Sequence, residues 1–304
     1  MIKILASDGM EKSAIAALEA KGCQVDVKFY DPDALCEAVQ DYDVLVVRSA
    51  TKVREPQINA ACMTGRLKLV IRAGVGIDNI DKVCAEGRGI SVCNTPRASS
   101  DAVAELALGH MFSCARFISA AGHTMREGKW EKKSYEGIEL SGKTVGIVGY
   151  GRIGQALGRR CQALGMSVLA FDIYKMPELE CDTMRYVEMD ELLKSSDIIS
   201  LHVPSLPGQP LVSREALTMM KDGVIIINTS RGTNVDEAAL LDALESGKVY
   251  GAGLDVFAEE PSKNEALYQH PRVSSTPHIG ASTQEAQARI GAEIVDLISK
   301  AFNL

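Results

Sequence analysis

One loop near the middle of the chain restricts the possible folds more than any other feature. Residues 149–154 read Gly-Tyr-Gly-Arg-Ile-Gly, which is the pattern G-x-G-x-x-G. The apolar segment Thr144–Val148 leads into the loop as a buried strand, and the amphipathic segment Ile153–Leu164 leads out of it as a helix. This order of strand, loop and helix predicts a dinucleotide-binding turn in a parallel sheet.

The three glycines of such a loop have separate roles. Gly149 allows the tight turn, Gly151 lets the backbone approach a pyrophosphate, and Gly154 permits close packing of helix on strand. Arg152 and Ile153 open the helix whose N-terminus faces the phosphates. All five residues are therefore predicted cofactor contacts.

An acidic residue follows the next predicted strand. Asp172 comes directly after Ser167–Phe171. A carboxylate at this point accepts hydrogen bonds from the adenosine ribose and repels a 2′-phosphate, so we expect NAD and not NADP. A surface aspartate beside an ordinary glycine-rich turn is the alternative, and the order of strand, loop, helix, strand and acid argues against it.

Strand-like and helix-like segments alternate along the whole chain, which predicts an α/β fold with parallel sheets. The strands are expected at Ile2–Ala6, Val25–Phe29, Val44–Val47, Leu67–Ile71, Thr144–Val148, Ser167–Phe171, Ile198–His202, Gly223–Asn228 and Ala252–Val256. The helices are expected at Lys12–Lys21, Ser99–Ala121, Ile153–Leu164, Met189–Ser195, Arg214–Met220, Glu237–Ser246 and Gln284–Ala301.

The position of the glycine loop at mid-chain predicts how the domains are arranged. Residues 98–282 should form a cofactor domain with a Rossmann doubly wound parallel sheet. Residues 1–97 and 283–304 should form a smaller flavodoxin-like α/β domain that binds substrate. The long apolar helix Ser99–Ala121 would link the two domains.

Composition excludes several classes of partner. The net charge is −7 and no long basic run occurs, which argues against nucleic acid. No apolar stretch is long enough to span a membrane, and the N-terminus lacks a signal-peptide pattern, so we expect a cytoplasmic protein. The eight cysteines include no C-x-x-C pair and no zinc-ligand spacing, so we expect reduced core residues and no metal.

Three polar residues follow predicted strands, at the edge where open parallel sheets bind ligands. Arg231 can present a planar fork to a carboxylate, and His278 can exchange a proton near neutral pH. Glu260 can orient that histidine. Each residue taken alone also has an ordinary interpretation: a surface cation, a solvated acid beside Glu259, and a turn residue after Pro277.

Together these segments resemble the D-isomer-specific 2-hydroxyacid dehydrogenases over nearly the whole chain. The resemblance is strongest to members of that family that oxidise 3-phospho-D-glycerate. The segments that carry it are Val47–Lys52, Arg72–Asn79, Asn94–Pro96, Gly128–Trp130, Val148–Gly154, Asn228–Gly232, Gly253–Phe257 and Thr276–Thr283.

The resemblance implies an activity and a set of site residues. The reaction would be NAD-dependent oxidation of 3-phospho-D-glycerate to 3-phosphohydroxypyruvate, the first step of serine biosynthesis. Arg231 would bind the substrate carboxylate, His278 would exchange the proton of the C2 hydroxyl, and Glu260 would pair with His278. The other implied cofactor contacts are Val75, Val203, Thr229, Ser230, Asp255, Gly280 and Ala281. The other implied substrate contacts are Arg48, Lys52, the turn residues Ala73, Gly74 and Gly76, and Lys132 with Lys133 from a neighbouring subunit.

Two other functions remain open at this point. A glyoxylate or hydroxypyruvate reductase would use the same catalytic residues and leave the phosphate-binding cations idle. An NAD-sensing binding protein would instead assemble with partners in response to the cofactor, and the full catalytic set argues against it. The resemblance further implies a homodimer formed through Ser99–Ala121 and Gly122–Tyr135. Because the sequence stops at Leu304, without the regulatory domain of longer relatives, no feedback by serine is expected.

Overall fold

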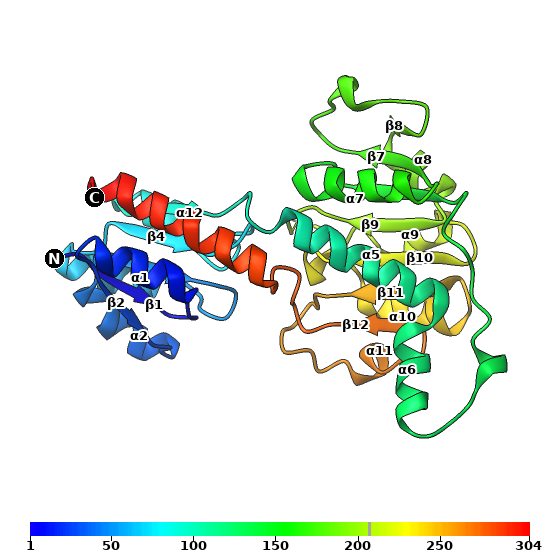
Figure 1. Cartoon of the computed structure of the whole chain (residues 1–304), viewed down its shortest axis with the longest axis horizontal. Helices are drawn as coiled ribbons and strands as arrows, with labels where there is room; N and C mark the ends of the chain where they lie inside the picture. Colours follow the sequence, from blue (N-terminus) through cyan, green and yellow to red (C-terminus); the bar gives the residue numbers. More distant parts are fainter. Residues whose placement is uncertain (206–207) are drawn as a thin grey trace. The chain divides into compact units, whose positions relative to one another are not determined.

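The computed structural model describes residues 1–205 and 208–304. The chain divides into two compact units (Figure 1). We call Met1–Ser99 with Ala281–Leu304 the outer unit, and Ser100–Gly280 the central unit. The boundaries expected from the sequence, at 97/98 and 282/283, lie close to these.

The outer unit is built on a five-stranded parallel sheet in the order β2-β1-β3-β4-β5. Its strands are β1 (Lys3–Ala6), β2 (Gln24–Val27), β3 (Val44–Val47), β4 (Leu69–Arg72) and β5 (Ser91–Asn94). Its helices are α1 (Lys12–Ala20), α2 (Pro32–Ala38), α3 (Glu55–Thr64), α4 (Lys82–Glu86) and α12 (Gln284–Phe302). This strand order confirms the flavodoxin-like fold.

Alternate residues of the outer sheet face opposite helix layers because side chains along a strand alternate between its two faces. Ile4 and Ala6 join the core beneath α1 and α12, whereas Leu5 joins the core beneath α2, α3 and α4. Helix α12 belongs to this unit because Gly291 lets it approach α1 closely. A Cβ at Gly291 would lie 2.8 Å from that of Ala14.

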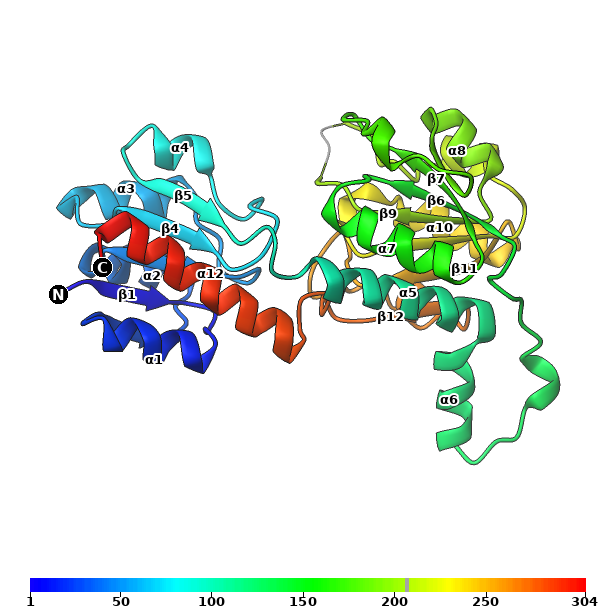
Figure 2. The same cartoon turned by 45° about the horizontal axis from the view of Figure 1, so that its top comes forward.

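The central unit contains a seven-stranded parallel sheet in the order β12-β11-β10-β9-β6-β7-β8 (Figure 2). Its strands are β6 (Thr144–Val148), β7 (Ser167–Phe171), β8 (Met184–Tyr186), β9 (Ile198–Leu201), β10 (Val224–Asn228), β11 (Val249–Leu254) and β12 (Val273–Ser275). The chain runs outward from β6 to β8, then returns and runs the other way from β9 to β12. This confirms the doubly wound Rossmann fold, whose ligand crevice lies at the carboxyl ends of the strands where the order reverses, between β6 and β9.

Two layers of helices cover the central sheet. Helices α5 (Ser100–Arg116) and α7 (Arg152–Ala163) share one buried core with it. Helices α8 (Met189–Ser195), α9 (Arg214–Met219) and α10 (Glu237–Glu245) share the other. The unit also contains α6 (Ile118–Arg126) and α11 (Glu265–Tyr268). Within the described residues, no helix has the length and apolar character needed to cross a membrane.

The single helix expected over Ser99–Ala121 is wrong, because the helix breaks at Phe117. This residue has a left-handed backbone (φ 54°), and α6 starts directly after it. The Phe117 ring packs against Tyr135 and Tyr250, at centroid distances of 5.9 and 5.7 Å. The returning chain also pairs with the end of α5, where the Ile138 N–H donates to the Ala115 carbonyl at 2.9 Å. Tertiary packing therefore turns the chain where the apolar pattern would continue a helix.

The cysteines are all free, but not all belong to the core. Cys23, Cys114 and Cys161 are buried, whereas Cys62 and Cys181 are exposed. The expectation of core cysteines is wrong for those two, because each lies near the end of an element or in a loop.

Candidate active site

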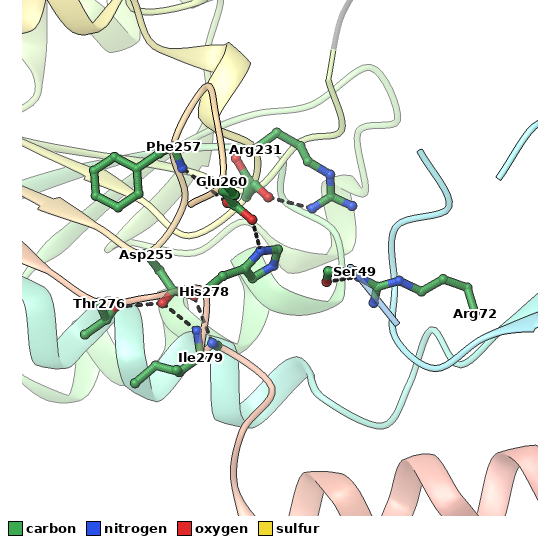
Figure 3. A network of polar contacts seen from close by, with 11 residues as sticks. Ser49, Arg72, Arg231, Asp255, Phe257, Glu260, Thr276, His278 and Ile279 are labelled. Carbon is green, nitrogen blue, oxygen red and sulfur yellow. Dashed lines mark hydrogen bonds and ion pairs between the residues drawn. The ribbon is translucent and has the colours of Figure 1, made fainter. Parts of the chain in front are cut away.

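The carboxyl edge of the central sheet collects most of the residues singled out in the sequence (Figure 3). Gly149 follows β6, Val203 lies just beyond β9, and the segment 229–231 follows β10. Asp255 follows β11, and the segment 276–280 follows β12. Parallel strands end at one edge, so segments far apart in the sequence meet there.

His278 and Glu260 form the polar pair at the centre of this edge (Figure 3). The distance from His278 Nδ1 to Glu260 Oε2 is 2.7 Å, and Glu260 Oε1 accepts the Phe257 N–H at 3.3 Å. An ionised carboxylate can only accept hydrogen bonds, so the pair places a proton on Nδ1 and leaves Nε2 to act on a ligand. The two side chains are 32% and 37% exposed, so both can be reached from outside the unit.

The charge of Glu260 is stabilised by its surroundings. Burial by itself raises the pKa of Glu260, but the hydrogen bond and charge of His278 act against it. The Phe257 N–H and the charge of Arg231 also lower the pKa, and the net result is a pKa below the usual value. Glu260 is therefore ionised near neutral pH and can balance a positive charge on His278.

The backbone of His278 is held by Asp255. His278 has a left-handed backbone (φ 54°), and its N–H donates to the Asp255 carbonyl at 2.8 Å. The Asp255 carboxylate is buried and accepts the Thr276 hydroxyl at 2.6 Å and the N–H groups of Ile279 and Gly280 at 2.8 Å each. Asp255 thus organises the loop that carries His278, a role the sequence did not reveal. Its contact with the nicotinamide carboxamide stays a prediction.

Arg231 stands in a loop that Asn228 shapes. The buried Asn228 side chain donates to the Arg231 carbonyl at 2.8 Å and accepts the N–H and hydroxyl of Ser230 at 3.0 and 2.8 Å. A Cβ at Gly232 would lie 1.9 Å from the carbonyl carbon of Phe257, so the loops bearing Arg231 and Glu260 are in backbone contact. This contact keeps the half-buried Arg231 on the same edge as the His278–Glu260 pair.

The glycine loop has the geometry of a phosphate cradle. Gly149 has a left-handed backbone (φ 91°), and a Cβ at Gly154 would lie 2.2 Å from the Gly149 carbonyl oxygen. A Cβ at Gly151 would meet nothing within 4 Å, so the space beside it is open. Helix α7 begins at Arg152, and its N-terminus therefore faces this space, where an anion is stabilised. Ile153 is half-buried and Arg152 is exposed.

Asp172 links the glycine loop to the end of β7. Its carboxylate accepts the Tyr150 N–H at 2.7 Å and the Tyr174 N–H at 2.9 Å. The acidic residue expected to bind ribose therefore also fixes the glycine loop. A carboxylate can accept further hydrogen bonds beyond these two, so both roles are compatible.

Unsatisfied polar atoms at the reversal point also fit a nicotinamide dinucleotide. The Thr229 hydroxyl and His202 Nδ1 are buried and have no hydrogen-bond partner among the described residues. Both lie just after neighbouring strands, β10 and β9. Buried polar atoms are normally paired, so orphaned ones at a ligand edge indicate a site for a polar ligand. The half-buried Val203 lies against Gly149 in the same region, and Ser230 is buried.

The outer unit carries the remaining predicted substrate residues. The loop that begins at Arg48 is anchored by Asp8, which accepts the N–H groups of Arg48 and Thr51 at 2.6 and 3.0 Å. The Asn79 side chain donates to the carbonyls of the same two residues at 2.6 and 2.8 Å. The Arg48 guanidinium makes no hydrogen bond or ion pair among the described residues, and Lys52 is exposed.

Arg72 is a further cation of the outer unit, to which the sequence analysis assigned no role. It is the last residue of β4, and its guanidinium donates to the Ser49 hydroxyl at 2.9 Å (Figure 3). Gly74 (φ 151°) makes room for it, since a Cβ there would lie 1.6 Å from Arg72 Nη1. The signal available in the sequence was a charged residue directly after the apolar run Leu69–Ile71, the same kind of position that singled out Arg231.

The turn at Ala73–Gly76 offers fewer free donors than expected. The Ala73 N–H donates to the Val47 carbonyl at 2.8 Å, and the Gly74 N–H donates to the Arg72 carbonyl at 2.9 Å. Both amides therefore already have partners, one at the end of β3 and one within the turn, and this part of the expectation is corrected. The amides of Val75 and Gly76 are the two left to face a ligand.

Lys132 and Lys133 lie away from the carboxyl edge of the central unit. Lys132 is exposed in a short 3-10 helix, and the segment around it contacts Tyr250, near the amino end of β11. The six residues of β11 separate that end from the carboxyl edge by about 20 Å. Within one chain, the central unit does not bring Lys132 or Lys133 to His278. Ala281 belongs to the outer unit, where its carbonyl accepts from Gln287 at 2.7 Å.

A Rossmann unit with a histidine–carboxylate pair and an arginine at its ligand edge defines an NAD-dependent oxidoreductase. Residues 108–280 match the family model described as D-isomer specific 2-hydroxyacid dehydrogenase, NAD binding domain. The chain belongs to this family, which confirms the resemblance, the NAD cofactor and a small 2-hydroxy acid as the class of substrate.

Known relatives cover the whole chain but differ in their named activity. The chain is 47% identical to a hydroxypyruvate reductase of Thermotoga maritima, over 99% of both chains. It is 44% identical to a D-3-phosphoglycerate dehydrogenase of Methanocaldococcus jannaschii, over 99% of this chain but only 57% of the relative. A solved glyoxylate reductase from Paecilomyes thermophila superposes with a TM-score of 0.87 at 34% identity, over 98% of this chain and 94% of that one.

Proposed function

We propose that this chain oxidises 3-phospho-D-glycerate to 3-phosphohydroxypyruvate with NAD, the first step of serine biosynthesis. The observation that carries the proposal is the 2.7 Å pair of His278 Nδ1 and Glu260 Oε2 beside Arg231 at the ligand edge. Several relatives at 43–44% identity are D-3-phosphoglycerate dehydrogenases, which supports the choice of substrate.

The residues of the central unit act on the C2 hydroxyl. Arg231 binds the substrate carboxylate with its planar fork and so turns C2 toward the cofactor. His278 takes the hydroxyl proton at Nε2, and Glu260 stabilises the imidazolium that results. NAD, when bound in the glycine-loop crevice, supplies the acceptor for the C2 hydride. The proton thus leaves the C2 hydroxyl oxygen for His278, the hydride leaves C2 itself, and a 2-keto acid remains.

The preference for a phosphorylated substrate rests on cations of the outer unit. Arg48 directly follows β3 and Arg72 ends the adjacent strand β4, and the Arg72 guanidinium donates a hydrogen bond to the Ser49 hydroxyl. Two guanidinium groups can bind a phosphate by paired hydrogen bonds. The anchoring of the Arg48 loop by Asp8 and Asn79 lowers the entropy lost when a ligand binds there.

A hydroxypyruvate or glyoxylate reductase is the second candidate. The Thermotoga relative favours it because its whole length is matched by this chain. Such a substrate keeps the carboxylate and C2 but lacks phosphate, so Arg231, Glu260 and His278 would act in the reverse direction. The cations at the end of β3 and β4 would then add little to the rate.

Steady-state assays by NADH absorbance separate the two candidates. We expect kcat/KM for 3-phosphohydroxypyruvate to exceed that for hydroxypyruvate and glyoxylate by about tenfold or more, which is about 1.4 kcal/mol. Arg48→Ala should abolish this preference. Arg88→Ala, which removes an arginine paired with Glu55, is the matched control and should keep it. A wild-type preference for hydroxypyruvate that Arg48→Ala leaves unchanged would establish the reductase.

The catalytic assignment has its own test. His278→Ala should reduce turnover of every substrate by about 100-fold or more. A near-normal rate in this variant would overturn the role of His278. If the wild-type protein turned over no 2-hydroxy acid or 2-keto acid at all while still binding NAD, the protein would be an NAD-sensing binding protein instead.

We also propose that the protein is a cytoplasmic homodimer. Helix α6 contains no buried residue, and it extends beyond the rest of the central unit (Figures 1 and 2). Large apolar side chains are exposed on α6 and just after it: Ile118 by 57%, Met125 by 53% and Trp130 by 79%. Exposure of such side chains to water is unfavourable, which indicates a surface covered by a partner. Light scattering should give twice the chain mass, and Trp130→Glu should reduce it to that of one chain.

A further inference from the structure

We propose that His110 is a positioning residue for the catalytic loop, acting as a neutral imidazole that donates from Nε2. The proposal rests on the proposed role of His278. In it, His110 orients Thr276 and, through Thr276, the carboxylate of Asp255. Asp255 in turn holds the backbone of His278.

His110 lies buried inside the central unit. It is on α5 and only 2% exposed. The ring lies across β11 at Gly253, where a Cβ would come within 2.5 Å of the His110 Cβ. The glycine therefore makes the space that the imidazole occupies. Both ring nitrogens have partners: Nδ1 lies 2.9 Å from the Ser274 hydroxyl, and Nε2 lies 3.0 Å from the Thr276 hydroxyl.

The direction of the hydrogen bonds follows from Asp255. The Asp255 carboxylate accepts hydrogen bonds from two backbone N–H groups and cannot donate. The Thr276 hydroxyl must therefore donate its hydrogen to Asp255, at 2.6 Å. Thr276 must then accept from His110, which places the ring hydrogen on Nε2. The lone pair on Nδ1 accepts the Ser274 hydroxyl in turn. A single arrangement of hydrogens therefore satisfies the four side chains of this network, Asp255, Thr276, His110 and Ser274.

The neutral form of His110 is favoured by its environment. Burial lowers the pKa of His110, and the charge of Asp255 acts in the opposite direction, with a net lowering. The outer end of the network continues from Ser274 to Ser119 at 3.4 Å and from Ser119 to Ser113 at 2.8 Å. These three serines border a small pocket with space for about one water molecule.

The loss of His110 would affect His278 through the hydrogen bond from Thr276 to Asp255 and those from the loop amides to Asp255. Without the Nε2 donor, the Thr276 hydroxyl is free to rotate away from Asp255. The Asp255 carboxylate would then shift between its remaining donors, the N–H groups of Ile279 and Gly280, which directly follow His278 in the loop. His278 holds a left-handed backbone that these bonds maintain. A small change there would misdirect the imidazole, which costs catalysis more than binding.

Two amide variants of His110 test the proposal. Glutamine places an amide nitrogen close to the position of Nε2 and can donate to Thr276, whereas asparagine is shorter and reaches only toward Ser274. We expect His110→Asn to lower kcat about 10-fold to 100-fold, with KM for substrate and Kd for NAD changed less than threefold. His110→Gln should restore kcat to within about threefold of wild type. Gly109→Ala, whose added Cβ meets nothing within 4 Å, is the control on the same helix and should behave as wild type.

Several outcomes would overturn the positioning role. One is an unchanged kcat in His110→Asn. Another is an equal loss of kcat, cofactor affinity and thermal stability in both amide variants, which would indicate a purely structural residue. If His110→Asn does not fold, Thr276→Val removes the same link at constant shape and should show the same selective loss of kcat; a normal kcat there would refute the link.

A readout that does not depend on activity separates this proposal from the proposed function. Nitrogen-15 NMR of the ring should show the Nε2–H tautomer for His110, unchanged between pH 8 and pH 6. A ring with its hydrogen on Nδ1 would contradict the hydrogen-bond direction. If His278→Ala retained full turnover, the proposed catalytic role of His278 would fail, while the NMR result would still decide the state of His110.

Discussion

Replacing Glu260 with glutamine tests the central electrostatic argument of the site. The substitution keeps the shape of the side chain and an oxygen that can accept from His278 Nδ1, but it removes the negative charge. In the native protein Glu260 Oε2 lies 2.7 Å from His278 Nδ1, and the pKa of Glu260 is held below its usual value. The neutral imidazole is affected little by the change, whereas the imidazolium formed during oxidation loses its counter-charge.

The size of the effect follows from the distance and the exposure. Two opposite charges with centres about 4 Å apart interact by about 1 kcal/mol in water and about 4 kcal/mol at an effective dielectric constant of 20. His278 and Glu260 are 32% and 37% exposed, so solvent screens the pair substantially. We therefore expect a loss of about 1–3 kcal/mol of transition-state stabilisation, or about 5-fold to 150-fold in kcat.

The assay is steady-state kinetics in both directions, with NAD affinity measured by calorimetry. Glu259→Gln is the matched control, because Glu259 is the neighbouring acid and pairs with Lys263 instead of His278. The control should keep its kcat, and both variants should bind NAD as the wild type does. A Glu260→Gln enzyme within twofold of wild type, or an equal loss in the two variants, would refute the reasoning.

The remaining predictions concern the cofactor loop and acid stability. Gly154→Ala should destabilise the fold by about 1–3 kcal/mol, because the added Cβ would lie 2.2 Å from the Gly149 carbonyl oxygen. Gly151→Ala should keep the melting temperature of the wild type but weaken NAD binding about tenfold or more, because its Cβ would occupy the open space beside the loop. Normal NAD binding by Gly151→Ala would contradict the role of this loop as a phosphate cradle. Asp172→Ala should narrow the preference for NAD over NADP by about tenfold, measured as a ratio of kcat/KM, and an unchanged ratio would remove Asp172 from the ribose site. Burial lowers the pKa of His202 from 6.5 to about 4, so the unfolded chain binds the extra proton between these values and stability falls as pH drops through that window. Denaturant unfolding at pH 7 and pH 5 should show about 2 kcal/mol of this loss, which His202→Asn should not show.

Segments with a local pattern were predictable. The strands β6, β7, β9 and β10 are apolar runs, and the glycine loop between β6 and α7 is formed by residues adjacent in sequence. By contrast, β8 and β12 have three residues each, too few to show any periodicity. The break at Phe117 was also hidden, because it arises from Tyr135, Tyr250 and the returning chain and not from the helix itself.

The candidate site divides along the same line. Arg231, Glu260 and His278 could be singled out because charged residues directly after buried strands are unusual and parallel strands end together. His110 could not, because its partners Ser274 and Thr276 lie 164 and 166 residues away in sequence. The hydrogen bonds that occupy the Ala73 and Gly74 amides, to the carbonyls of Val47 and Arg72, were likewise not predictable.

Residue type and local order are therefore enough to predict the α/β class, the split arrangement of the domains, the cofactor and the family. The tertiary structure decided which groups touch: Glu260 with His278, Asp255 with the loop 276–280, and His110 with Thr276. Hydrogen bonds require distances near 3 Å, and no sequence pattern sets such distances between segments brought together only by folding.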